Sequence, residues 1–195
     1  MRKNLRTTAP PEGFRYQANV LPPDEEQVLV EHIRGLPLKE FEFHGYIGKR
    51  RTLSYGWHYD FGQEKLQPAD EIPAFLRKAR KSAATFAGLA TEALPHALIT
   101  EYSPGTTIGW HRDKGVFDDV IGISLVSSCN FRLRRRIASG WERYSLIVEP
   151  RSAYLLRGVA RTEWEHSIPA VDALRYSITF RSLRRSLYPR TGGSH

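Results

Sequence analysis

The chain has 195 residues, a formal net charge of +8, and 41% hydrophobic and 11% aromatic residues. This length fits one domain, and the apolar content excludes a chain that is intrinsically disordered throughout. The single cysteine, Cys129, excludes an intramolecular disulfide, and no apolar run approaches the roughly 18 residues of a membrane span. The basic N-terminus has no apolar core after it, so we expect no secretory signal. The single cysteine fits a reducing compartment, and we expect a soluble, cytoplasmic protein that is a monomer.

The positive charge indicates partners and says nothing about chemistry. Excess lysine and arginine attracts polyanions and speeds encounter with them. Nucleic-acid contact is one interpretation of this charge, and simple solubility is the other. The basic clusters are Lys49-Arg50-Arg51, Arg77-Lys78-Arg80-Lys81, Arg132-Arg134-Arg135-Arg136 and Arg184-Arg185.

Two amphipathic helices are predicted in the N-terminal half, after an irregular, extended segment over residues 1–20. The first begins at Pro22-Pro23-Asp24, with Asp24 as its cap, and Gly35 ends it. The second runs from about residue 73 to residue 90, where apolar residues recur every three or four positions and basic residues occupy the opposite face.

Between the two helices, residues 39–61 interleave aromatic residues, glycines and arginines. Aromatic rings stack on bases and arginines bind phosphates, so this composition fits a base-binding surface. A two-stranded hairpin whose aromatic residues pack onto the core fits the same composition. Both interpretations stay open on composition alone.

Short strands follow at roughly ten-residue spacing, separated by turns. This order of helices first and strands afterwards predicts an α+β fold, a double-stranded β-helix (jelly roll) with two supporting N-terminal helices. The predicted strands are 96–103, 107–113, 120–127, 129–135, 143–149, 153–157 and 173–182.

A candidate metal site lies within the second of these strands. Residues two apart in a strand point to the same face, so His111 and Asp113 would project together. They would supply two ligands of the 2-His-1-carboxylate triad that holds non-haem Fe(II). A second His-x-Asp, His58-Tyr59-Asp60, precedes the long helix, and we interpret it as ordinary packing or as part of a substrate lid.

The residues that follow decide between the two pairs. His166 lies about fifty residues after Asp113, and Arg175 begins a strictly alternating run about ten residues later. Arginines on one face of that run could bind a dicarboxylate through two-donor forks, although a solvent-facing polar side is the simpler explanation. The order His-x-Asp, His, Arg is what an Fe(II) enzyme dependent on 2-oxoglutarate needs.

These motifs resemble the AlkB family of Fe(II)- and 2-oxoglutarate-dependent dioxygenases, and the match covers roughly residues 97–183. The chain departs from the family pattern at Ser177, where the family usually has Asn, and at Thr100, where an Asn often binds the cosubstrate. The matching stretches are 99–105, 108–113, 123–125, 165–168 and 175–181.

The resemblance implies roles for three sets of residues. The metal ligands and catalytic residues would be His111, Asp113 and His166. Arg175 would pair with the distal carboxylate of 2-oxoglutarate, and Arg181 would lie near its metal-side carboxylate or Asp113. The cosubstrate-binding set would be Tyr102, Arg175, Ser177, Thr179 and Arg181. A substrate lid would be built around Tyr46, Arg50, Arg51, Tyr55 and Trp57.

The implied function is oxidative demethylation of alkylated bases in DNA or RNA, of the repair type, with Fe(II) as cofactor and 2-oxoglutarate as cosubstrate. Its products would be succinate, CO2 and formaldehyde. Two alternatives remain: the same chemistry on a protein side chain, and a catalytically silent jelly-roll binding module. Residues 1–195 would form a single AlkB-like domain, with helices and lid at 1–95, the jelly-roll core at 96–183 and a basic, partly disordered tail at 184–195.

Overall fold

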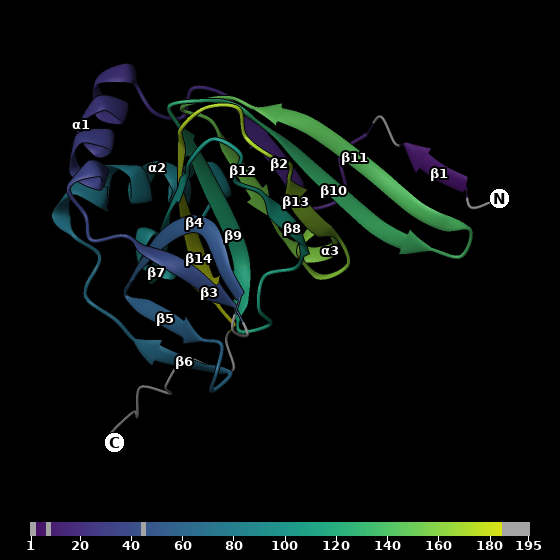
Figure 1. Cartoon of the computed structure of the whole chain (residues 1–195), viewed down its shortest axis with the longest axis horizontal. Helices are drawn as coiled ribbons and strands as arrows, with labels where there is room; N and C mark the ends of the chain where they lie inside the picture. Colours follow the sequence, from purple (N-terminus) through teal and green to yellow (C-terminus); the bar gives the residue numbers. More distant parts are fainter. Residues whose placement is uncertain (1–2, 7–8, 44–45, 185–195) are drawn as a thin grey trace.

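The computed structural model of the chain describes the backbone of residues 3–6, 9–43 and 46–184, and the side chains of residues 9–40 and 49–184. Two β-sheets form the body, and helices α1 and α2 lie together at one end of the view in Figure 1. The long hairpin of β10 and β11 extends to the opposite end. The predicted jelly roll is confirmed. Residues 185–195, which include nearly all of the predicted tail, lie outside the described residues.

The larger sheet has the strand order β2-β12-β9-β14-β7-β4-β3. Its strands are β2 (Phe14–Gln17), β3 (Lys39–Phe43), β4 (Tyr46–Tyr55), β7 (His96–Tyr102), β9 (Phe117–Leu125), β12 (Ala153–Leu156) and β14 (Arg175–Leu183). Strand β14 lies between β9 and β7, so the alternating run found in the sequence is a central strand.

The smaller sheet has the order β1-β11-β10-β13-β8, and β5 and β6 form a separate hairpin. Its strands are β1 (Lys3–Arg6), β8 (Ile108–His111), β10 (Cys129–Ile137), β11 (Gly140–Val148) and β13 (Glu165–Ile168), and the hairpin consists of β5 (Trp57–Asp60) and β6 (Lys65–Pro68). Strand β8 ends at His111, so the prediction of a strand reaching residue 113 is wrong, and Asp113 lies in the loop that follows.

Both predicted helices form, with changes at their ends. Helix α1 (Pro23–Arg34) has Pro22 at its N-cap, so the prediction that Asp24 caps it is wrong. Asp24 lies inside the first turn, where its charge suits the positive end of the helix. Gly35 ends the helix as predicted.

The second predicted helix divides into a short 3-10 turn, η1 (Ala74–Leu76), and helix α2 (Arg77–Ala87). Gly88 ends α2 with a φ of 68°, a left-handed conformation that glycine adopts without the steric cost of a side chain. Several short elements were not predicted. They are the 3-10 turn η2 (Thr91–Ala93), α3 (Gly158–Thr162) and strands β1, β2, β6 and β13. Helix α3 has only five residues, too few to show a helical period.

Two hydrophobic cores lie on the two sides of the larger sheet. One joins the helices to its outer face, with Leu29, Ala83 and Ile178 among its buried members. The other fills the space between the two sheets and includes Phe131 and Leu133 of β10. Strand β14 is therefore covered on both faces, and polar groups on its inner face are removed from water. No helix in the described part of the chain is long and apolar enough to span a membrane.

Candidate active site

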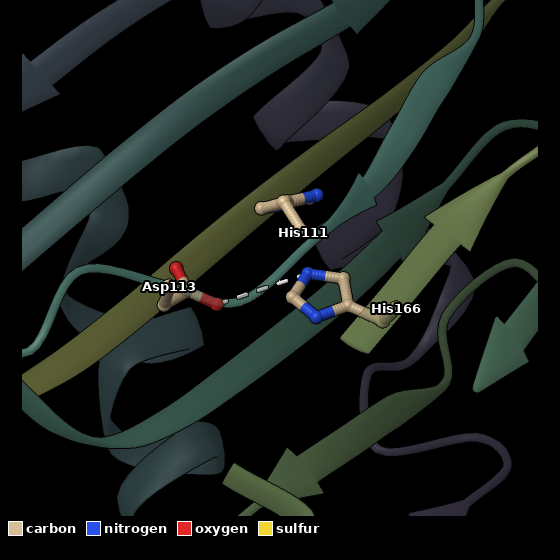
Figure 2. Close-up of side chains that lie close together, drawn as sticks. All are labelled: His111, Asp113 and His166. Carbon is tan, nitrogen blue, oxygen red and sulfur yellow. Dashed lines mark ion pairs between the residues drawn. The ribbon is translucent and has the colours of Figure 1, made fainter. Parts of the chain in front are cut away.

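The structure brings His111, Asp113 and His166 together on the inner side of the smaller sheet. His111 is the last residue of β8 and pairs directly with His166 of β13, while Asp113 approaches from the loop after β8. One possible ligand atom from each residue lies within 4.8 Å of the others. Figure 2 shows the Asp113 carboxylate directed toward the His166 ring, with His111 beside them.

Arg181 orients the Asp113 carboxylate. Its Nε and Nη2 atoms lie 2.8 and 2.7 Å from Oδ1 of Asp113. The other oxygen, Oδ2, is buried without a hydrogen-bond partner and lies 3.7 Å from Nε2 of His166. Burial alone would raise the pKa of Asp113, but Arg181, His166 and His111 outweigh it and hold that pKa below its usual range. The result is an ionised carboxylate with one oxygen available to a metal.

The two histidines present the chemistry of metal ligands. The Nδ1 atom of His111 donates a hydrogen bond to the backbone oxygen of Gly109 at 2.9 Å, which leaves Nε2 as the ligand atom. His166 is buried and stacks on Phe131. Burial, with His111 adding to it, lowers the pKa of His166 to about 3, so its ring is neutral at physiological pH. Two imidazoles and one carboxylate fit Fe(II).

Arg175 is a fully buried cation on β14, about 0% exposed. Its Nε donates to Oγ of Ser124 at 3.0 Å, and its guanidinium lies 4.7 Å from the Tyr102 ring centroid. Its Nη1 atom is buried without a hydrogen-bond partner, and no carboxylate among the described residues forms an ion pair with it. A buried cation without an anion is costly, so this position fits one carboxylate of 2-oxoglutarate.

A row of small hydroxyl residues crosses the inner face of the larger sheet beside Arg175. Ser177 pairs in register with Thr100 on β7 and with Ser124 on β9. Thr100 pairs in turn with Thr52 on β4, and the Ser177 and Tyr102 hydroxyls are 3.4 Å apart. The two departures from the AlkB pattern, Ser177 and Thr100, are therefore cross-strand neighbours.

The inner face of β14 corrects one interpretation of its alternation. Arg175, Ser177 and Thr179 are all buried, and Arg181 contacts Asp113. A solvent-facing polar side, the simpler explanation, is therefore wrong for this strand. The physical reason is its central position, because the smaller sheet covers this face and the helices cover the other.

Tyr154 of β12 is a residue of the site that the sequence analysis missed. It crosses the inner face above Gly122, its partner in register on β9, and a Cβ atom at Gly122 would lie only 2.3 Å from the Tyr154 ring. Burial raises the pKa of Tyr154, so its hydroxyl stays protonated near the cosubstrate position. A glycine inside a buried strand is the sequence signal for such a close approach.

The triad opens into a cavity of about 1240 Å³. The cavity lies between the inner face of the larger sheet, the loop after β8 and the β5–β6 hairpin. Several aromatic rings line it, which gives flat apolar walls near the metal ligands. They include Tyr59, Phe61, Trp110 and Phe117.

The β5–β6 hairpin is connected to the metal-binding loop through Lys114. The Nζ atom of Lys114 lies 5.2 Å from the ring centroid of Tyr59 and 5.1 Å from that of Phe61. Lys114 directly follows Asp113, so a movement of the hairpin that shifted Lys114 would also shift the loop that holds Asp113. The His58-Tyr59-Asp60 motif thus lines the cavity, in agreement with the lid interpretation, and lies outside the metal group found among the described residues.

The predicted substrate lid is largely part of the larger sheet. Arg50 lines the cavity. Its pKa lies below the usual value, mainly because of burial; Tyr102 opposes this shift and Arg181 adds to it. Arg51 lies on the other side of β4 and forms a two-point ion pair with Glu101, at 2.8 Å for each contact. The expectation that Arg51 faces the substrate is therefore wrong, because neighbouring residues of a strand point to opposite faces.

Of the aromatic residues of the predicted lid, the two with described side chains, Tyr55 and Trp57, do not line the cavity. Tyr55 is buried in the core beneath the helices, as the packing interpretation requires. Trp57 begins β5, pairs in register with Pro68, and is not among the described residues that line the cavity. The side chain of Tyr46 lies outside the described residues. Tyr59 and Phe61, which the sequence analysis did not assign to the lid, line the cavity instead.

The chain matches the model of the 2OG-Fe(II) oxygenase superfamily over residues 13–181. The chain belongs to this superfamily. Members use Fe(II) and 2-oxoglutarate. The triad fits Fe(II), and Arg175, which has no carboxylate partner among the described residues, fits 2-oxoglutarate. This 2OG-Fe(II) oxygenase is therefore a dioxygenase, and the alternative of a catalytically silent module is set aside.

Two relatives carry the comparison further. The chain is 28% identical over 165 residues to the "Alkylated DNA repair protein ALKBH8 homolog" of Arabidopsis thaliana, with 71% of this chain and 48% of the relative covered. It is 26% identical over 192 residues to "Uncharacterized protein L905" of Acanthamoeba polyphaga mimivirus, covering 88% and 85%. The chain thus spans about half the length of the Arabidopsis relative.

Solved structures share the fold at low sequence identity. The structure of OsALKBH1 aligns with a TM-score of 0.61 at 15% identity, covering 87% of this chain and 96% of that one. A prolyl-4-hydroxylase from Pseudomonas putida aligns at 0.60 and 17%, covering 89% and 93%. A 2OG-Fe(II) oxygenase from Burkholderia pseudomallei aligns at 0.62 and 12%, covering 94% and 97%. These structures show the shared fold. The superfamily match, the Arabidopsis relative and the fold shared with OsALKBH1 support the AlkB-like resemblance.

Proposed function

We propose that this oxygenase removes alkyl groups from nucleic-acid bases by oxidative demethylation. The observation that carries the proposal is the cavity, which sets flat aromatic walls and cations beside an Fe(II) triad. A methylated base is flat, aromatic and joined to phosphates, so it matches such a cavity in shape and charge. The net charge of +8 and the name of the Arabidopsis relative support the same substrate class.

The triad and cosubstrate supply the chemistry. With Fe(II) held by His111, Asp113 and His166, the site would couple the O2-dependent decarboxylation of 2-oxoglutarate to hydroxylation of the N-methyl carbon. One oxygen atom of O2 would enter succinate as CO2 is released, and the other would enter the methyl group. The C–N bond of the hydroxymethyl group would then break, which releases formaldehyde and restores the N–H of the base. The protein contributes position and exclusion of water. Arg181 keeps Asp113 ionised and turned toward the metal by holding its Oδ1 atom.

Arg175 is the anchor that we propose for the distal carboxylate of 2-oxoglutarate. The hydrogen bond from its Nε to Ser124 fixes the orientation of the guanidinium, which leaves the terminal nitrogens to bind the carboxylate. The Tyr102 hydroxyl and Ser177 add neutral donors next to it. Thr179 lies two residues further along the same face of β14, between this anchor and Arg181.

Tyr59, Phe61 and Arg50 are the candidates for contact with the base. The two rings approach each other at 5.1 Å between centroids in an edge-to-face arrangement, and both belong to the hairpin end that Lys114 holds. Both rings line the same cavity as the metal ligands, so a base held there would lie beside them. Arg50 is supported by its position in the cavity wall.

The test uses the purified full chain with Fe(II) and 2-oxoglutarate on five substrates: methylated single-stranded DNA, methylated single-stranded RNA, the two matching duplexes and a methylated peptide. We expect formaldehyde in step with loss of methyl groups from at least one nucleic acid, together with succinate. His111→Ala should give neither product. Formaldehyde from the peptide alone, or hydroxylation of a peptide without formaldehyde, would replace the nucleic acid with a protein substrate.

A further inference from the structure

The β10–β11 hairpin exposes one face that the active site does not use. On β10, Phe131 and Leu133 are buried between the sheets, so the alternate residues Arg132, Arg134 and Arg136 point to the outer face. Figure 1 shows the hairpin extending away from helices α1 and α2, which leaves this face uncovered by either helix. Arg136 is exposed and Arg132 and Arg134 are half-buried, so a partner can reach these side chains from the outer face.

Arginine and tryptophan side chains alternate in space across this outer face. The guanidinium of Arg134 lies 4.4 Å from the ring centroid of Trp110 and 4.1 Å from that of Trp141. Arg132 lies 5.1 Å from Trp110, and Arg136 lies 5.4 Å from Trp141. We call this set, together with Arg143, which lies 5.9 Å from Trp110, the Arg–Trp face.

The charge on the Arg–Trp face is largely unneutralised. Glu165 pairs with Arg134 at 2.6 Å, and Arg132 donates to the neutral hydroxyl of Ser167. In the described part of the chain, no carboxylate forms an ion pair with Arg132, Arg136 or Arg143. If the Arg–Trp face served only to stabilise the hairpin, Arg134 between Trp110 and Trp141 would be enough. The other arginines around Arg134 have the same charge and would add little stability.

Trp110 connects the Arg–Trp face to the active site. It directly precedes the ligand His111, and it lines the cavity as well as contacting the arginines. A nucleic-acid strand with one base in the cavity would leave the cavity beside Trp110, at the edge of the Arg–Trp face. From there the arginines follow β10 at alternate positions, about 6.8 Å apart by strand geometry.

We propose that the Arg–Trp face binds the single-stranded nucleic acid that flanks the base held in the cavity. This proposal rests on the proposed function. Arg132, Arg136 and Arg143 contact successive phosphates, and the indoles, chiefly Trp141, offer surfaces on which bases stack. Stacking with backbone contacts is the physical basis of single-strand binding that tolerates many sequences. A duplex offers phosphates but hides its base faces, so the interleaved indoles favour a single strand.

The test measures binding of an unmethylated, fluorescently labelled single-stranded oligonucleotide to the full chain, over a series of salt concentrations. The double variant Arg136→Gln, Arg143→Gln removes two charges away from the metal site. We expect about tenfold weaker binding at low salt and a slope of log affinity against log salt that is smaller by about 1.4 in magnitude, since each phosphate contact on a single strand contributes about 0.7. Trp141→Leu should weaken binding without changing the slope.

The matched control is Arg77→Gln, Lys81→Gln, which removes the same charge from the exposed face of α2. Equal weakening in this control would mean that net charge alone attracts the oligonucleotide, and would overturn the proposal. Binding of polyglutamate as tight as that of the oligonucleotide would overturn it as well, because polyglutamate has no bases to stack. Melting temperatures of all variants verify that each has folded.

Turnover separates this proposal from the proposed function. With a methylated trinucleotide, the Arg136→Gln, Arg143→Gln variant should match the unmodified protein, whereas its KM for a longer methylated strand should rise about tenfold. A longer strand that is no better a substrate than the trinucleotide for the unmodified protein would overturn the Arg–Trp face. If no nucleic acid yields formaldehyde but the oligonucleotide binding and its loss in the variant persist, the demethylation is wrong and the binding face stands.

Discussion

Strands β14 and β10 both carry arginines at alternating positions, and they put them to opposite uses. On β14, Arg175 and Arg181 point to the inner face, and Arg175 is completely buried. On β10, Arg132, Arg134 and Arg136 point outward from the smaller sheet. The two runs look alike in sequence, because strand periodicity reports that two faces differ and does not report which one is covered.

The difference teaches how burial determines what a cation can bind. A guanidinium removed from water needs a matched anion in a fixed position, as Arg181 has in Asp113 and as Arg175 would have in 2-oxoglutarate. An exposed guanidinium interacts with any polyanion, and salt screens that interaction. We therefore expect changes on β14 to act on geometry and turnover, and changes on β10 to act on salt-dependent binding.

The largest effect is expected at the metal-binding triad, which includes Asp113, the carboxylate that Arg181 holds. Asp113→Ala and His111→Ala should abolish iron-dependent succinate formation, because either change removes one of three protein ligands. Iron binding followed spectroscopically under anaerobic conditions measures the loss directly. The control is His58→Ala, which should keep iron. Loss of iron in His58→Ala with retention in His111→Ala would mean that the wrong His-x-Asp pair has been assigned.

Arg175→Lys should give the next largest effect. We expect the KM for 2-oxoglutarate to rise at least about tenfold, because an ammonium cannot reproduce a planar two-donor fork and a charged hydrogen bond contributes about 1.5–3 kcal/mol. The matched change on the exposed strand, Arg136→Lys, should leave that KM unaltered. If Arg175→Lys also left it unaltered, Arg50 would become the candidate anchor.

Gly122→Ala examines the packing that supports the buried face. The added Cβ would collide with the Tyr154 ring, so we expect a loss of about 1–3 kcal/mol in the free energy of unfolding. Chemical denaturation measures it. Gly115→Ala is the control, since a Cβ there meets no atom within 4 Å. Equal stability of the two variants would show that Tyr154 moves aside without cost.

The smallest effect is expected at Arg51, an arginine whose partner lies on the same surface of the larger sheet. Its side chain is 48% exposed, so the pair with Glu101 is screened, and Arg51→Ala should cost less than about 1 kcal/mol of unfolding free energy. Oligonucleotide affinity should stay within twofold of the unmodified protein. A large drop in affinity would mean that Arg51 contacts the nucleic acid, and that an arginine paired with a carboxylate can bind it as the unpaired arginines do.

Much of the active site could be predicted from the order of its motifs. The motifs predict that His111, Asp113 and His166 share one site, and the structure brings them together. The resemblance places Arg181 near either the metal-side carboxylate of 2-oxoglutarate or Asp113, and the structure shows the contact with Asp113. The lid was predicted poorly because β4 joins the larger sheet, which turns Arg51 and Tyr55 away from the cavity. Tyr154 was missed because it comes from β12, a strand with no recognisable motif.

The sequence by itself determined the family motifs, the alternation of the strands and the presence of two helices, since these depend on residue type and local spacing. Only the tertiary structure decided which face of each alternating strand is buried, because that depends on the neighbouring strands and on the layer that covers them. It decided in the same way that Ser177 and Thr100 lie side by side, and that Trp110 lies within reach of both the cavity and the arginines of β10. Such contacts join residues far apart in the chain, and no local pattern contains them.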